Sequence, residues 1–173
     1  KIFFYPQMAK EEISAWLGEE YSYKPQTGKD LGEKMMNAFK QTFEEGFQRV
    51  LIIGSDCPDL TNTVLHEAFE SLKTHDAVIG PSFDGGYYLI GFKKKTFLPD
   101  IFEELEWGAS TVFKKTMATL KKNGYAIHIL QKWRDIDRIE DLLCLFHVHR
   151  NKNTTFANSR TLSLLPDIFK GKK

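Results

Sequence analysis

Short apolar runs alternate with longer amphipathic segments along nearly the whole chain of 173 residues. The apolar runs are typical of strands that are buried on both faces, and the segments between them carry apolar residues at helical spacing. This alternation favours a parallel or mixed sheet with helices on both faces. The predicted strands are 2–5, 49–53, 76–80, 87–92 and 125–130, and the predicted helices are 9–17, 30–45, 61–74, 110–122, 137–148 and 160–169.

The predicted strand 87–92 breaks the pattern, because no helix separates it from strand 76–80. A crossover between two parallel strands needs about a dozen residues or more. We therefore expect strand 87–92 to run antiparallel to its predecessor or to lie at an edge of the sheet.

The composition suits one domain and excludes several classes of protein. The net charge is +1 and no basic block occurs, which argues against nucleic acid as a partner. Two cysteines are too few for a disulfide scaffold, so we expect a cytoplasmic setting. No apolar run approaches the roughly 20 residues of a membrane span. We expect the domain to cover residues 1–150, with a C-terminal tail helix at 151–173 that belongs to it.

One strand ends at a glycine and is followed at once by acidic residues, in the sequence GSDCPDL at 54–60. Open α/β sheets bind ligands at the carboxyl ends of their strands, where a carboxylate can hold a divalent cation and the cation a phosphate. Asp56 is therefore the first candidate for a metal ligand. Asp59 can instead cap the next helix. Cys57 is expected to fill space rather than to act as a nucleophile, since no histidine is placed to activate it.

A second polar loop contains Asp84 followed by Gly85 and Gly86. Two consecutive glycines permit positive φ and let the backbone approach a ligand closely. The alternative is an ordinary Asp-Gly hairpin turn. The loop becomes informative together with Asp56, because both loops can face the same crevice.

A third acidic segment contains Asp135 and Asp137 on either side of one apolar residue. In an extended segment these two side chains point to the same side, so either can complete a metal site. Asp137 can also cap the following helix, with Glu140 as its capping-box partner. Trp107, in a separate loop, can line an acceptor pocket or can be a core or lid aromatic.

These motifs, in this order, resemble the bacterial DUF2064 family. They are GSDCPDL, GPSFDGGYYLIGF, the Trp-Gly loop at 107–108, the Asp-Ile-Asp segment from 135 and the element QTGKDLGEKM from 26. The resemblance implies a GT-A-like, nucleotide-diphospho-sugar transferase fold: a three-layer α/β/α sandwich with a mainly parallel mixed sheet. It also implies a relation to molybdenum-cofactor guanylyltransferase and phospholactate guanylyltransferase.

The resemblance further implies roles for individual residues and a Mg²⁺ or Mn²⁺ cofactor. Asp56 would be the metal ligand, and Asp135 or Asp137 the second acidic group near the metal. We assign Asp137 to the metal, and Asp84 and Asp135 to catalysis. The residues expected to contact the nucleotide or the acceptor are Gln26, Asp30, Ser55, Gly85, Gly86 and Trp107.

The chain departs from the family pattern at three places. It begins at Lys1 without an initiator methionine, and we expect the family's Gly- and Lys/Arg-rich phosphate loop to be missing from it. Lys34 stands where the family has arginine, a change that can lose a bidentate phosphate contact. Ala109 replaces a threonine after the Trp-Gly pair.

The predicted function is metal-assisted transfer from a nucleotide-activated donor to an unknown small-molecule acceptor. The donor is a nucleotide sugar or a nucleoside triphosphate, so glycosyl and nucleotidyl transfer are both open. In glycosyl transfer, Asp84 or Asp135 would be the acceptor base. The alternative is a non-catalytic nucleotide- or sugar-binding domain. Aromatic residues that we expect to be exposed in 1–23 leave a homodimer open.

Overall fold

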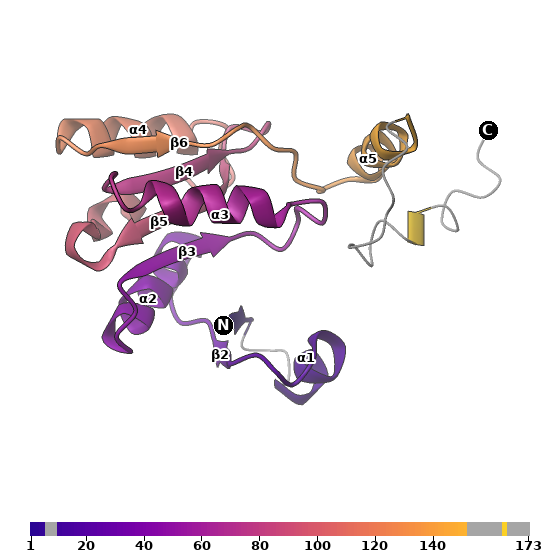
Figure 1. Ribbon diagram of the computed structural model, residues 1–173, viewed down its shortest axis with the longest axis horizontal. Coiled ribbons are helices and arrows are strands. Elements are labelled where there is room, and N and C mark those ends of the chain that lie inside the picture. The colour runs from indigo at the N-terminus through magenta and orange to yellow at the C-terminus, as the bar shows by residue number, and fades with distance from the viewer. Residues whose placement is uncertain (6–9, 152–163, 166–173) are drawn as a thin grey trace.

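The computed structural model describes residues 1–5, 10–151 and 164–165 (Figure 1). The strands are β1 (Ile2–Phe4), β2 (Tyr23–Pro25), β3 (Arg49–Ile53), β4 (Ala77–Pro81), β5 (Tyr87–Lys93) and β6 (Ile127–Ile129). The helices are α1 (Lys10–Leu17), α2 (Leu31–Glu44), α3 (Asn62–Ser71), α4 (Val112–Lys122) and α5 (Ile139–Asn151), with short 3-10 turns η1 (Lys94–Thr96) and η2 (Pro99–Phe102). Most of the predicted helix 160–169 lies outside the described residues.

The main sheet has four strands in the order β3-β5-β4-β6. β5 pairs antiparallel with both β3 and β4, whereas β4 and β6 are parallel. Strand 87–92 is therefore antiparallel, as one of the two predictions had it, but it lies inside the sheet rather than at its edge. Because β3, β4 and β6 run the same way, their carboxyl ends lie along one side of the sheet, which we call its carboxyl edge. β1 and β2 form a separate parallel pair.

Helices cover both faces of the main sheet, which confirms the predicted α/β class (Figure 1). On one face, the core is built from side chains of α2, η2 and α4, and Phe39 of α2 stacks among several other phenylalanines. On the other face, Val64 and Ala68 of α3 pack against Val78 and Leu89. The period-2 alternation of the strands places their apolar residues in these two cores in turn.

An irregularity in β5 redirects one aromatic side chain towards the other face. The register between β4 and β5 shifts next to Gly80, so Tyr88 and Leu89 both join the α3 core while Tyr87 packs on the opposite side. Gly80 leaves the room that this needs, since a Cβ there would lie 2.4 Å from the Tyr88 ring. The Tyr88 hydroxyl then donates to the Gln131 carbonyl at 3.1 Å. The bulge thus fixes the start of the segment that follows β6.

The predicted helix 30–45 is confirmed together with its cap. Asp30 occupies the N-cap position of α2, and its Oδ1 accepts the Glu33 N–H at 2.8 Å. Gly46, at φ +98°, follows the helix, as is common after a helix end. None of the helices in the described ranges has the length and apolar character that crossing a bilayer requires.

Candidate active site

The loops that follow β3, β4 and β6 are joined to one another at the carboxyl edge of the sheet. The Trp133 N–H donates to the Pro81 carbonyl at 3.0 Å, and the Trp133 ring Nε1 donates to Asp59 Oδ1 at 2.8 Å. The Ile136 N–H donates to the Asp56 carbonyl at 2.9 Å. The segment after β6 is therefore hydrogen-bonded to both of the other loops.

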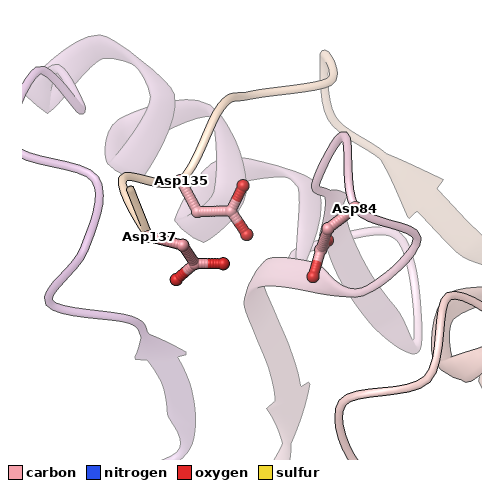
Figure 2. Close-up of side chains that lie close together, drawn as sticks. All are labelled: Asp84, Asp135 and Asp137. Carbon is pink, nitrogen blue, oxygen red and sulfur yellow. The ribbon is translucent and has the colours of Figure 1, made fainter. Parts of the chain in front are cut away.

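Three of the predicted acidic residues come together here. One carboxylate oxygen from each of Asp84, Asp135 and Asp137 lies within 4.8 Å of those from the other two. Figure 2 shows their carboxylates turned towards a common space, Asp84 from the loop after β4 and the other two from the segment after β6. Asp84 and Asp137 are exposed, and Asp135 is half-buried. Mg²⁺ and Mn²⁺ prefer oxygen ligands, so this carboxylate cluster (Asp84, Asp135 and Asp137) fits such an ion.

Local hydrogen bonds hold Asp84 in place. Its Oδ1 accepts the Gly86 N–H at 2.9 Å and also accepts the hydroxyl of the buried Ser82. Gly85 has φ +97°, and its carbonyl accepts the Phe113 N–H at 2.9 Å near the start of α4. The loop is thus the hairpin turn between β4 and β5 and, at the same time, the support of a site carboxylate. Both interpretations of this motif apply.

Charge accumulates around Asp135. Burial raises the pKa of Asp135, and the neighbouring carboxylates of Asp84, Asp137 and Asp56 raise it further. Asp56 itself is exposed and lies outside the carboxylate cluster, but its charge acts on Asp135. Ionised carboxylates crowded in this way are stabilised by a cation between them.

We expect Asp135→Asn to stabilise the metal-free fold at pH 7. The folded-state pKa is raised above the ordinary value of 3.8, so ionisation destabilises the folded state as the pH rises through that window, and the full penalty is present above it. The variant lacks this penalty and should melt about 1–3 °C higher in EDTA, a small gain because solvent screens the charges. Melting curves at pH 7 and near pH 3.5 check this. A gain that persists at the lower pH would contradict it.

Cys57 is buried beneath the loop that carries Asp56. Burial, followed by the charges of Asp56, Asp135 and Asp59, raises the pKa of its thiol to about 12. The thiolate is therefore scarce at neutral pH, which agrees with the prediction that Cys57 fills space rather than attacking a substrate.

Neither of the two helix caps considered as alternatives, at Asp59 and at Asp137, is formed. α3 begins after Thr61, so Asp59 is not its cap and instead accepts the Trp133 ring N–H. α5 begins at Ile139. The Asp141 side chain accepts the Arg138 N–H at 3.1 Å, so Arg138 and Asp141 take the positions considered for Asp137 and Glu140. The Asp137 side chain turns to the carboxylate cluster instead.

The residues predicted to contact the nucleotide lie in different surroundings. Gln26 is half-buried, and its side-chain amide donates to the Phe3 carbonyl of β1 at 3.3 Å. Asp30 caps α2, as described above. Ser55 is exposed in the loop after β3, next to Asp56. Ser55 thus lies in one of the three loops that meet at the site, as do Gly85 and Gly86 in the loop of Asp84.

Trp107 is half-buried at the border of the core. Its ring makes an edge contact with Tyr87 at 6.4 Å between centroids and packs against the core on the α2 side. A Cβ at Gly32 of α2 would lie 2.6 Å from the Trp107 Nε1, so the glycine makes room for the indole. These contacts fit the alternative that Trp107 is a core aromatic residue.

Two supporting residues were not assigned a role from the sequence. Ser82 donates to Asp84, and Trp133 connects the three loops. The Ser-x-Asp spacing is a local signal for the first of these, because serine and aspartate side chains often bond within a turn. Trp133 offers no such signal, since its partner Asp59 lies 74 positions away in the chain.

The chain is similar to several known proteins. Curated relatives from Methanocaldococcus jannaschii and Methanocaldococcus sp. (strain FS406-22), both named 2-phospho-L-lactate guanylyltransferase, are 32% and 28% identical over 82% and 76% of this chain. The chain spans 62% and 57% of their lengths. A crystal structure from Desulfovibrio desulfuricans G20, provisionally assigned as a nucleotide-diphospho-sugar transferase, superposes with a TM-score of 0.90 at 39% identity. That match covers 96% of this chain and 72% of the other.

The structural match shows that the chain has the fold of that protein. The sequence model of DUF2064, a family described as uncharacterized and conserved in bacteria, matches residues 1–109, a range that includes Asp56 and Asp84. Asp135 and Asp137 follow that range and complete the carboxylate cluster. On this match, the chain belongs to the DUF2064 family.

Proposed function

We propose that this protein is a divalent-metal-dependent nucleotidyltransferase. It would transfer a nucleoside monophosphate from a nucleoside triphosphate to a small phosphorylated acceptor and release pyrophosphate. The observation that supports this most is the carboxylate cluster at the carboxyl edge of the sheet. The guanylyltransferase names of the Methanocaldococcus relatives favour nucleotidyl transfer, and make GTP the first donor to test.

The metal would be held by Asp84, Asp135 and Asp137, with Asp56 close enough to act on the same charge. When bound, Mg²⁺ or Mn²⁺ neutralises the negative charge of the donor phosphates. The protein's own part is to hold the carboxylates in place. Ser82 and Gly86 fix Asp84, and the bond from Ile136 to Asp56 holds the segment after β6 against the loop after β3.

The transfer itself needs little help from a protein base. An oxygen of the acceptor phosphate attacks the α-phosphorus of the donor, and the bond from that phosphorus to the oxygen bridging to the β-phosphate breaks. A phosphate monoester has its second pKa near 6 and is already largely ionised at neutral pH. Positioning and charge neutralisation are therefore the main requirements, and a carboxylate cluster meets the second through its metal.

Glycosyl transfer is a second candidate, favoured by the assignment of the Desulfovibrio structure. A hydroxyl acceptor must lose a proton to a base during this reaction. Asp135 suits that role better than an ordinary carboxylate because its pKa is raised. In this reaction a nucleoside diphosphate, rather than pyrophosphate, would leave.

A thermal-shift panel separates these possibilities. The panel contains the four nucleoside triphosphates and a set of UDP- and GDP-sugars, each with Mn²⁺ and with EDTA. We expect a triphosphate, GTP first, to raise the melting temperature by about 5–10 °C in the presence of Mn²⁺, the shift for a ligand near 100 times its Kd. A Mn²⁺-dependent shift with nucleotide sugars alone would favour glycosyl transfer. The absence of a shift with every nucleotide would contradict both and favour the non-catalytic alternative.

A further inference from the structure

Two cationic side chains lie over one exposed aromatic ring on the segments that carry the carboxylate cluster. Phe83 is 54% exposed, and the Lys132 Nζ and the Arg134 Cζ lie 4.7 Å and 5.1 Å from its ring centroid. Phe83 directly precedes Asp84, and Arg134 directly precedes Asp135. Each cation–π contact therefore joins the two segments that carry the cluster.

The positions of the two cations follow from the frame of the site. Trp133, which lies between them, forms a parallel bridge with Ser82 and donates its N–H to the Pro81 carbonyl. This pairing places Lys132 and Arg134 on either side of a fixed residue, with both side chains over the tip of the neighbouring loop. Backbone hydrogen bonds, and not only contact with an exposed ring, thus hold the two cations over this loop.

Only part of the positive charge of Lys132 and Arg134 is paired with carboxylates. Arg134 Nη1 lies 3.3 Å from Asp141 Oδ1, while Asp141 Oδ2 also accepts the Arg138 N–H at the start of α5. Arg134 therefore keeps further N–H donors for a second partner, since a guanidinium carries five. Within the described part of the chain, no carboxylate lies at ion-pair distance from Lys132.

We infer that Lys132 and Arg134 are an anion-binding pair that holds a phosphate or carboxylate group of a substrate next to the carboxylate cluster. This inference rests on the proposed function. The cluster alone repels anionic substrates, and two cations on the segments that carry it offset part of that repulsion. Arginine suits a bidentate contact with phosphate or carboxylate, and lysine adds a mobile point charge.

The same chemistry can belong to the triphosphate of the donor or to the anionic groups of the acceptor. Two probes distinguish these sources in direct binding measurements by calorimetry with Mg²⁺ present. One is GTP, and the other is phosphoglycolate, a small molecule with one phosphate and one carboxylate. Binding is compared for wild type, the double variant Lys132→Ala/Arg134→Ala and the charge-keeping variant Lys132→Arg.

The matched control is Lys95→Ala. Lys95 is an exposed lysine in η1, which follows the far end of β5 and so lies at the opposite edge of the sheet. We expect the double variant to weaken binding of at least one probe by about 10-fold or more, as is typical for hydrogen bonds to charged groups. Lys132→Arg and Lys95→Ala should bind like wild type, and all variants should keep the wild-type melting temperature.

A loss confined to phosphoglycolate assigns the pair to the acceptor, and a loss confined to GTP assigns it to the donor; both support the inference. Equal binding of both probes by wild type and the double variant would overturn it, as would a wild type that binds neither probe. The measurement is independent of turnover. If wild type binds through this pair but never forms pyrophosphate from GTP, the proposed function fails while the anion-binding pair stands.

Discussion

Asp135→Asn is expected to lower metal-dependent nucleotidyl transfer by more than about 100-fold. Residues that only orient a metal ligand already cost 10–100-fold when replaced, and Asp135 belongs to the cluster itself. The amide keeps the size of the side chain but loses the charge that a divalent cation needs. Release of pyrophosphate from GTP, with a small phosphorylated acceptor, measures the effect.

The control for this prediction is Asp100→Asn, which removes an exposed carboxylate on η2, outside the cluster. It should leave turnover within about twofold of wild type, as is usual for surface substitutions away from special features. Asp135→Asn should therefore melt at a higher temperature than wild type in EDTA and yet be much less active. A variant that is less active because it is unfolded would show the opposite stability.

Gly85→Ala should be strongly destabilising. A Cβ at Gly85 would lie 2.1 Å from the Ser110 carbonyl oxygen, and the residue has φ +97°. Left-handed backbone costs an alanine about 1–2 kcal/mol and overpacking typically costs about 1–3 kcal/mol, so the sum is roughly 2–5 kcal/mol. Denaturant unfolding measures this. Because Gly85 supports Asp84, the metal-dependent nucleotide shift should also be lost.

Gly108→Ala is the matched control for the cost of placing an alanine at positive φ. Gly108 has a similar φ of +90°, but a Cβ there would meet nothing within 4 Å. The control should therefore lose only about 1–2 kcal/mol. Equal losses in the two variants would show that the close approach of Gly85 to Ser110 contributes nothing.

The α/β class and most elements could be predicted from the sequence because they depend on local signals. The cap at Asp30 and the periodicity of α2 are contained within a few neighbouring residues. The place of β5 within the sheet could not be predicted. It depends on which strands pair with its two edges, and apolar runs do not carry that information.

The acidic residues of the site could also be found in the sequence, but not their grouping. Asp84 joins Asp135 and Asp137, while Asp56 lies beside them, because bonds between loops distant in the chain fix the arrangement. A helix cap was one alternative for Asp59 because aspartate is favoured at that position, yet its side chain accepts a hydrogen bond from Trp133, far along the chain. Tertiary contacts of this kind override local propensity.

The cytoplasmic location, the homodimer, the metal cofactor and the boundary of the tail at 151 stay predictions. Only residues 164 and 165 of the tail's latter part are described, and there Leu165 packs against Leu145 of α5.

Binding of Mn²⁺, followed by the loss of the free-ion electron paramagnetic resonance signal, tests the central claim most directly. Wild type is compared with a variant in which Asp84, Asp135 and Asp137 are all replaced by asparagine, at a temperature where both are folded. In the absence of nucleotide, we predict that wild type binds Mn²⁺ and that the triple variant binds none. Equal Mn²⁺ binding by the two proteins would contradict the assignment of the carboxylate cluster as the metal site.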